Sequence, residues 1–237
     1  IPKVNFYKKW FCKFAVWTIE MNLIIDIGNT STKLAVFQRD KVLIAKTVEG
    51  FSLVIEVENL LKQFTEIKRG FVSSVGFLSE DELKTLEKRL PMTVLNSTLK
   101  LPFKVHYKTP NSLGADRLAL MAAAATQYSG KNVLVIDAGS CITYDFIDSK
   151  KNYLGGAIAP GIQMRYKSLG DFTSSLPTLQ KIVPKNSIGN STHDSIHSGV
   201  INGVLYEIEG TVNEYQNKYP DLTVILTGGD ADFLCKQ

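Results

Sequence analysis

The sequence predicts an α/β fold made of two copies of one unit, each with a phosphate-binding hairpin, and a nucleotide cleft between them. Two apolar runs predict this fold, because each ends in Asp-x-Gly followed by a polar residue. The first run is Leu23–Thr30, and the second, Leu134–Ser140, begins 111 positions later. Glycine lets backbone N–H groups approach an anion closely, and the aspartate can hold a hydrated cation. One Asp-x-Gly is ordinary turn chemistry, whereas two in matching strand contexts indicate phosphate binding.

The segments after both loops read as strand, turn and strand. Residues 33–37 and 41–47 are strand-like around a turn at 38–40, and residues 141–147 and 153–159 repeat the pattern around a turn at 148–151. Walker and dinucleotide sites need glycine motifs that open a helix, and the chain contains neither motif. Both loops are therefore predicted to lie in β-meanders, which excludes the helix-based nucleotide folds.

The rest of the first half alternates between helix and strand. Apolar spacing predicts a helix over residues 51–64, and residues 69–75 read as the next strand. Ser79 is a helix cap with three carboxylates after it, and Pro91 marks the end of that helix. A short strand over residues 92–95 follows. The connection over residues 96–111 contains two prolines and is expected to separate the halves.

The second half begins with an alanine-rich helix over residues 116–128. After its meander come a glycine-rich strand end at residues 155–161, a helix over 162–169 and a long loop over 170–190. Thr192 opens a long helix, and a last strand over residues 222–226 ends in Thr-Gly-Gly-Asp. We expect domains over residues 21–110 and 111–237, the second truncated at its C-terminal end, because too few residues follow the last strand for an average helix.

Composition narrows the functional classes. The 237 residues are 44% hydrophobic and 21% charged, which suits a substantial core. Of the net charge of +4, residues 1–20 carry +3, so the chain from Met21 onward is nearly neutral and direct nucleic-acid binding has little electrostatic support. Residues 1–20 are expected to be an upstream extension outside the fold. The three cysteines form neither a zinc pattern nor a disulfide framework, and no apolar run is long enough to span a membrane, so a cytoplasmic location is expected.

Three aspartates are placed for phosphoryl transfer, which requires positioned phosphates, neutralised charge and a carboxylate that orients the acceptor hydroxyl. Asp26 and Asp137 belong to the two phosphate loops, and Asp116 opens the alanine-rich helix. Asp116-Arg117 by itself could be a helix-start charge with a surface ion pair. Together with both loops, Asp116 becomes the catalytic candidate.

Five motifs, taken in order, resemble those of type III pantothenate kinases. They are Asp26-x-Gly28-Asn29-Thr30-x-x-Lys33, Gly114-x-Asp116-Arg117, Asp137-x-Gly139-Ser140, Gly155-Gly156-x-Ile158-x-Pro160-Gly161 and Thr227-Gly228-Gly229-Asp230. The resemblance runs from Met21 to the end of the chain. It implies two duplicated actin-like (ribonuclease H-like) domains with an ATP cleft between them. It also implies ATP-dependent phosphorylation of pantothenate to 4'-phosphopantothenate, the first step of coenzyme A biosynthesis.

The resemblance also implies roles for residues at the nucleotide. ATP would bind residues of both loops, namely Asp26, Ile27, Gly28, Asn29, Thr30, Ser31, Thr32, Lys33 and Ser140. Asp26 would organise the magnesium that accompanies ATP, and Lys33 would balance phosphate charge. Asp137 would bind a monovalent cation, potassium or ammonium. Ser140 stands where the family usually has threonine and keeps the hydroxyl.

For the substrate, the resemblance implies a pantothenate wall formed by Tyr107, Gly114, Ala115, Asp116 and Arg117. Arg117 suits a carboxylate because guanidinium can bind it bidentately, and Asp116 would accept the proton of the attacking hydroxyl. Thr192 would reach pantothenate across the interface of a homodimer, and it could also be a helix N-cap.

Two other functions remain open from the sequence. A non-catalytic regulator of the same family is disfavoured by Asp116, because a binding-only protein would not need a hydroxyl-orienting carboxylate. Another kinase or phosphatase of the superfold, acting on a sugar or polyphosphate, is disfavoured by the short chain and by the pattern from Tyr107 to Arg117.

Overall fold

The computed structural model describes residues 5–6, 20–48, 53–76 and 78–237, arranged in two compact units. The first unit comprises Phe11–Gln127, and the second comprises Tyr128–Gln237 with the short strand β1 (Asn5–Phe6). The predicted boundary, after residue 110, differs from this division. Helix α3 (Ala115–Gln127) groups with the first unit, where it contacts strand β5 (Ile67–Ser74).

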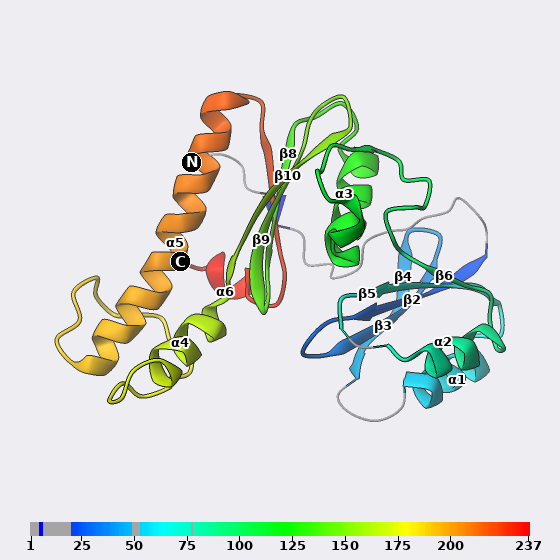
Figure 1. Ribbon diagram of the computed structural model, residues 1–237, viewed down its shortest axis with the longest axis horizontal. Helices are drawn as coiled ribbons and strands as arrows, with labels where there is room; N and C mark the ends of the chain where they lie inside the picture. Colours follow the sequence, from blue (N-terminus) through cyan, green and yellow to red (C-terminus); the bar gives the residue numbers. More distant parts are fainter. Residues whose placement is uncertain (1–4, 7–19, 49–52, 77) are drawn as a thin grey trace. The chain divides into compact units, whose positions relative to one another are not determined.

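The sheet of the first unit has five strands in the order β4-β3-β2-β5-β6 (Figure 1). The predicted meander is confirmed, because β2 (Met21–Ile27), β3 (Thr32–Gln38) and β4 (Lys41–Val48) pair antiparallel. Strands β5 and β6 (Met92–Val94) extend the sheet in parallel. The buried β2 thus has a neighbour on each side, and its carboxyl end carries the first phosphate loop.

Helices α1 (Leu53–Gln63) and α2 (Glu80–Glu87) lie together along this sheet (Figure 1). Their apolar side chains pack against alternate β2 residues, including Leu23, Ile25 and Ile27. Ile24 belongs to a separate small cluster with Ala35 and Phe37. Alternation along β2 therefore directs Asp26, like Ile24, away from the α1 and α2 side. The start of the predicted helix over 51–64, at residues 51–52, lies outside the described residues.

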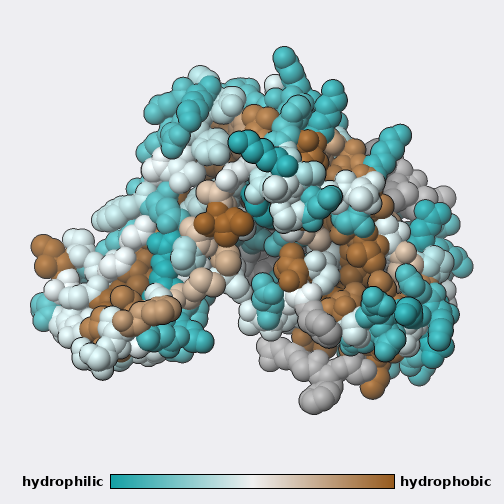
Figure 2. Space-filling model, in the orientation of Figure 1, coloured by the Kyte–Doolittle hydropathy of each residue, from teal (hydrophilic) through white to brown (hydrophobic). Residues whose placement is uncertain are grey.

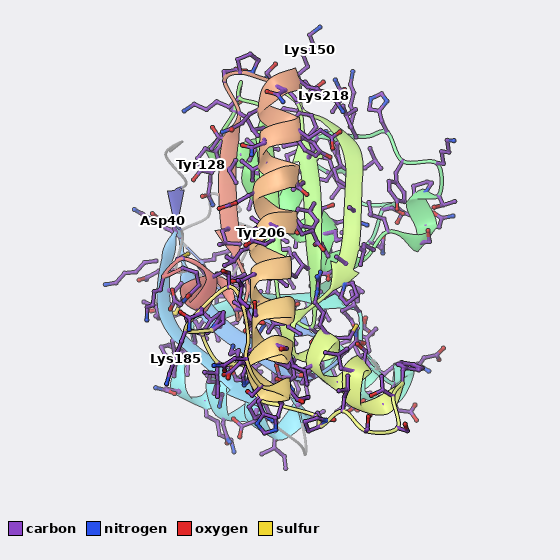
Figure 3. All side chains as sticks on the ribbon, turned by 90° about the vertical axis from the view of Figure 1, so that its left-hand side faces the viewer. Asp40, Tyr128, Lys150, Lys185, Tyr206 and Lys218 are labelled. Atoms are coloured by element: carbon purple, nitrogen blue, oxygen red, sulfur yellow. The ribbon has the colours of Figure 1, made fainter. Side chains whose placement is uncertain are left out.

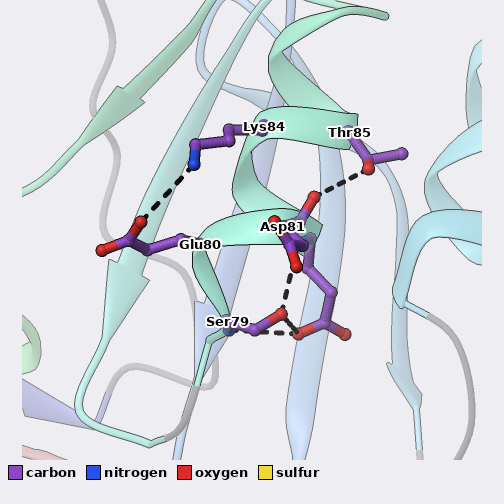
Figure 4. A network of polar contacts seen from close by, with 6 residues as sticks. Ser79, Glu80, Asp81, Lys84 and Thr85 are labelled. Carbon is purple, nitrogen blue, oxygen red and sulfur yellow. Dashed lines mark hydrogen bonds and ion pairs between the residues drawn. The ribbon is translucent and has the colours of Figure 1, made fainter.

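Ser79 caps α2 as predicted, and the cap is a full capping box (Figure 4). Its Oγ accepts a hydrogen bond from the backbone N–H of Glu82 at 3.2 Å, and Glu82 Oε2 accepts one from the backbone N–H of Ser79 at 3.1 Å. Two donors at the helix start are thereby satisfied by side chains. The connection that follows β6 contains a two-residue strand, β7 (Lys104–Val105), and a 3-10 turn at Pro110–Ser112.

The second unit repeats the topology of the first. Within it the strands run in the order β1-β11-β8-β9-β10, so an antiparallel meander is again extended by a parallel strand. The meander consists of β8 (Val133–Ala138), β9 (Cys141–Ile147) and β10 (Asn152–Pro160), and β11 (Thr223–Thr227) is the parallel strand. The duplication expected from the two loops is confirmed. Strand β1 pairs with β11, so two residues of the segment expected to lie outside the fold join this sheet; most of residues 1–20 lie outside the described residues.

The helices of this unit are α4 (Ile162–Asp171), α5 (Thr192–Lys218) and α6 (Ala231–Leu234). The core joins β9 to α4 and α5 through apolar side chains such as Tyr144, Tyr166 and Val204. A polar network also links these elements. The Tyr144 hydroxyl donates to Glu207 Oε1 at 2.7 Å, and Arg165 pairs with Glu207 Oε2 at 2.6 Å. Helix α5 also binds the segment that precedes it, because Ser198 Oγ donates a hydrogen bond to the backbone carbonyl of Ser187.

Candidate active site

The first phosphate loop is the tight hairpin between β2 and β3. Gly28 closes it by donating its N–H to the carbonyl of Ser31 at 3.0 Å, while Asn29 and Thr30 are exposed at the tip. The backbone that follows β5 packs closely against the loop, since a Cβ on Gly76 would lie 2.5 Å from the Gly28 carbonyl oxygen. Ile27 is buried below the hairpin, and its carbonyl accepts from the N–H of Gly76 at 3.1 Å. The predicted ATP residues 26–33 thus form one continuous backbone turn that a neighbouring strand holds in place.

Asp26 lies at the carboxyl end of β2 between charged and polar neighbours. Strand pairing sets it opposite Lys33 on β3 and opposite Ser73 on β5. Burial raises the pKa of Asp26, the Lys33 ammonium and the Ser73 hydroxyl lower it, and the Asp116 carboxylate raises it, with a net rise. Asp26 and Asp116, 90 positions apart in the sequence, are therefore close enough to influence each other. Two carboxylates and an ammonium at one place can hold a hydrated cation and a phosphate.

Asp116 lies in the first turn of α3 and is held by its own helix. Its Oδ1 accepts a hydrogen bond from the backbone N–H of Arg117 at 2.8 Å. Gly114 leaves room for that oxygen, because a Cβ there would stand only 2.4 Å from Oδ1. Ala115 is buried and anchors the start of the helix. The carboxylate is thereby fixed at the helix N-terminus, where the backbone dipole favours negative charge.

Arg117 lies beside Tyr107, another residue of the predicted pantothenate wall. The guanidinium carbon of Arg117 lies 5.8 Å from the centre of the Tyr107 ring, although the two residues come from different segments of the first unit. Arg117 is 5% exposed, so its charge is held in a largely desolvated place. A guanidinium at this distance over an aromatic ring makes a cation–π contact, and its planar fork can bind a carboxylate bidentately.

The second phosphate loop follows β8 and, like the first, is closed by a hydrogen bond from the N–H of its glycine. Gly139 donates its N–H to the carbonyl of Cys141 at 2.8 Å, and Ser140 is exposed. Gly161 fits closely against the loop, since a Cβ there would lie 2.3 Å from the Gly139 carbonyl oxygen. The glycine-rich end of β10 is therefore part of the loop's support.

The third glycine motif supports Asp137. Gly228, at the exit of β11, has a φ of +99°, and a Cβ there would lie 2.4 Å from Asp137 Oδ1 and 2.2 Å from the Ala138 carbonyl oxygen. The same Ala138 carbonyl accepts the N–H of Asp230 at 2.9 Å. Glycine at this position keeps side chains away from the Asp137 carboxylate. A carboxylate oxygen is a ligand type that hard monovalent and divalent cations accept. Within the described ranges, no three His, Cys, Asp or Glu side chains gather as a metal-binding group.

Thr192 lies at the start of α5 beside a surface groove of about 940 Å³. The N-cap of α5 is Ser191, whose side chain accepts from the N–H of Asp194, so the alternative role of Thr192 as N-cap is wrong. Thr192 is the first helical residue instead and stays exposed. Hydrophobic surface gathers around α4 and the loop after it, where Phe172 and Ile188 are more than four-fifths exposed (Figure 2). The groove is lined by residues that include Arg165, Leu169, Leu176, Thr192, Ile196 and Val200.

The predicted site residues fall into two groups. The first unit brings together Asp26 with its loop, Tyr107 and the segment Gly114–Arg117, while the second holds Asp137, Ser140 and Thr192. Sequence reasoning missed Ser73, which lies beside Asp26. The signal available was a pair of serines ending an apolar strand, at residues 73–74.

Comparison with known proteins agrees with the motifs. The sequence profile described as type III pantothenate kinase matches residues 22–214. A type III pantothenate kinase of Christiangramia forsetii is 47% identical over 214 residues, covering 90% of this chain and 88% of the relative. One from Flavobacterium johnsoniae is 44% identical, covering 92% and 89%.

Solved structures also share this architecture. A Campylobacter jejuni protein described as a Baf family transcriptional activator has a TM-score of 0.54 and 25% identity, with 90% of this chain and 86% of that chain covered. A Listeria monocytogenes protein described as an N-acetylmannosamine kinase has a TM-score of 0.53 and 15% identity, with 91% of this chain and 87% of that chain covered. At this identity the likeness shows a shared fold and nothing about the substrate. In the described part of the chain, no helix is long and apolar enough to cross a membrane. The chain belongs to the type III pantothenate kinase family.

Proposed function

We propose that this chain transfers the γ-phosphoryl group of ATP to the primary hydroxyl of pantothenate, forming 4'-phosphopantothenate in the cytoplasm for coenzyme A biosynthesis. The observation that carries the proposal is the proximity of the Asp116 and Asp26 carboxylates, with Lys33 paired opposite Asp26. Phosphoryl transfer needs this combination of a cation-holding carboxylate, a phosphate-balancing ammonium and a carboxylate for the acceptor hydroxyl. The nucleotide cleft between the two halves belongs to the same proposal.

Each group in the first unit then has a role. The backbone turn of residues 27–32 and the Lys33 ammonium bind phosphate oxygens, and Asp26 holds the hydrated magnesium that accompanies ATP. Magnesium supplies charge neutralisation at the transferring phosphoryl group. Arg117 binds the pantothenate carboxylate and thereby directs the primary hydroxyl toward Asp116. Asp116 accepts a hydrogen bond from that hydroxyl and takes its proton as the new bond forms.

The second unit contributes the remaining contacts. Ser140 donates its hydroxyl to ATP, and Asp137 holds potassium or ammonium beside the phosphates. The glycine at position 228 supports this role, because a side chain there would collide with Asp137 Oδ1. A monovalent cation there neutralises phosphate charge that the protein leaves uncompensated.

A homodimer is part of the proposal, with Thr192 reaching the partner's pantothenate site. Supporting it is the outer face of α5, where Gly199, Gly203 and Gly210 follow one another at helical spacing around Tyr206, which is 64% exposed (Figure 3). A Cβ at any of these glycines would meet nothing within 4 Å. Glycine inside a helix costs about 1 kcal/mol relative to alanine, and no contact among the described residues requires it. Small residues let another helix approach closely, so the partner's surface provides a reason for them.

The interface is tested with a matched pair of variants, Gly203→Leu and Gly203→Ala. Gly203→Leu should halve the mass measured by light scattering and raise the KM for pantothenate, because the bulky side chain blocks approach and removes the partner's Thr192. Gly203→Ala should keep more of the dimer. A monomeric wild type, or a dimeric Gly203→Leu with unchanged KM, would contradict this part of the proposal.

The activity is tested by pantothenate-dependent release of ADP with ATP, magnesium and potassium. Turnover with pantothenate, and none with N-acetylmannosamine or another sugar, is the expected result. Asp116→Asn should abolish turnover while leaving ATP binding largely intact. Nucleotide binding without turnover on any acceptor would instead favour the non-catalytic regulator.

A further inference from the structure

Ser73 occupies the position beside Asp26 on the strand opposite to Lys33. Parallel pairing of β2 with β5 sets Asp26 against Ser73, and antiparallel pairing of β2 with β3 sets it against Lys33. Paired residues on adjacent strands point to the same face, with side chains about 5 Å apart. The carboxylate of Asp26 therefore lies in a row between an ammonium and a hydroxyl.

The hydroxyl of Ser73 is buried and turned toward this row. Ser73 is 9% exposed, and its Oγ makes no well-aligned hydrogen bond with any residue in the part of the chain that the structure describes. It lies close enough to Asp26 to lower the pKa of that carboxyl, so it stabilises the carboxylate form. A buried hydroxyl that lacks a good partner is costly, so apolar residues are the usual choice at such a position. Its presence beside Asp26 indicates a function in the site.

The neighbouring serine provides a contrast. Ser74 follows Ser73 on the same strand, so its side chain points to the other face. Its Oγ donates to the carbonyl of Gly76 at 3.0 Å, which accounts for it locally as part of the turn that leaves β5. Of these two adjacent hydroxyls, only that of Ser73 faces the phosphate site.

We propose that Ser73 is a positioning residue of the phosphate site, whose hydroxyl holds the Asp26 carboxylate in the orientation that receives the hydrated magnesium of the nucleotide. This inference rests on the proposed function. Asp26 has two competing neighbours: the Lys33 ammonium attracts its carboxylate and the Asp116 carboxylate repels it. Without Ser73, the carboxylate turns toward Lys33, forms a closed ion pair and withdraws both charges from magnesium and phosphate. A hydroxyl donor on the opposite side keeps the carboxylate between its neighbours.

The test compares Ser73→Ala with the matched control Ser74→Ala. Ser73→Ala should raise the magnesium concentration for half-maximal turnover about tenfold or more, the usual effect of removing a residue that orients a metal ligand. The KM for pantothenate should stay unchanged, since Arg117 is untouched. Ser74→Ala should lose some thermal stability and keep the wild-type magnesium dependence.

A binding measurement separates this inference from the activity. Titration of magnesium into protein with ADP, followed by the rise in melting temperature, should show the same tenfold weakening for Ser73→Ala. Ser73→Thr keeps the hydroxyl and should therefore keep most of the wild-type affinity for magnesium. Ser73→Cys is of similar size with a weaker donor, so its affinity should fall between those of Ser73→Thr and Ser73→Ala. Equal magnesium dependence in Ser73→Ala and Ser74→Ala overturns the role of Ser73. Absence of turnover in the wild type, with magnesium-dependent ADP binding intact, overturns the proposed function instead.

Discussion

Replacing Gly114 by alanine tests whether the placement of the Asp116 carboxylate limits the reaction. A Cβ at this position would lie 2.4 Å from Asp116 Oδ1, and contacts of this kind do not occur below 3.0 Å. The next neighbour, Val75 Cγ1, would lie at 3.5 Å, an ordinary contact. The carboxylate is therefore the group that must move, by at least about 0.6 Å, and the hydrogen bond from the Arg117 N–H is strained or broken as it does.

The size of the effect follows from this displacement. A misplacement of about 1 Å at a reacting group costs on the order of 100-fold in rate. A shift of 0.6 Å or more then predicts a fall in kcat of roughly 10- to 100-fold, equivalent to about 1.4 to 2.7 kcal/mol in the barrier. The KM for ATP should change little, because the first phosphate loop is not touched.

The assay is ADP release at saturating substrates, with the melting temperature measured beside it. Gly70→Ala is the matched control, since a Cβ there would lie 2.3 Å from Met92 Sδ, a similar crowding of a flexible side chain away from Asp116. Asp116→Asn sets the floor of activity. A wild-type kcat in Gly114→Ala, or an equal loss in Gly70→Ala, would refute the reasoning.

Three further changes have defined outcomes. Ser79→Ala should destabilise the fold by about 1 kcal/mol in urea unfolding, because it removes the cap of α2. The Ser79 hydroxyl is also the main cause of the lowered pKa of Glu82. The stabilisation that this hydrogen bond gives is present above the ordinary pKa of a glutamate and is lost as the pH falls through the lowered value. The difference in unfolding free energy between wild type and Ser79→Ala should therefore narrow in acid. Gly156→Ala should cost about 3 kcal/mol or more of stability, because its Cβ would lie 1.6 Å from the backbone carbonyl oxygen of Tyr144, on the strand paired with it. Thermal unfolding near the wild-type temperature would contradict this. Arg117→Lys should raise the KM for pantothenate about tenfold with a smaller change in kcat, since lysine keeps the charge and loses the planar fork that binds a carboxylate bidentately. Steady-state kinetics with an unchanged KM would exclude the carboxylate contact.

Local chemistry explains which parts of the fold could be predicted. The hairpins after Gly28 and Gly139 follow from apolar runs, turn residues and strand propensity within about thirty residues. The cap at Ser79 also depends on neighbours only three positions away. The predicted unit boundary did not match, because the alanine-rich helix gave no local sign of whether it packs against β5 or against the following strands.

The N-cap of α5 shows a finer limit. Ser191 and Thr192 are both good capping residues, and their order in the sequence cannot decide between them. The backbone at Ser191 is extended and its side chain meets the N–H of Asp194, so the helix begins one residue earlier than a cap at Thr192 would require.

By itself, the sequence determined the duplicated α/β unit, the two phosphate loops and the residues of the family motifs, because each depends on short runs of neighbouring residues. Only the tertiary structure decided which of these residues meet. Ser73 lies beside Asp26 because β2 pairs in parallel with β5. Asp116 lies near Asp26 because α3, which carries it, packs against β5. Strand register and helix packing are set by the complementarity of whole buried surfaces, and no local pattern at Ser73 or Asp116 encodes them.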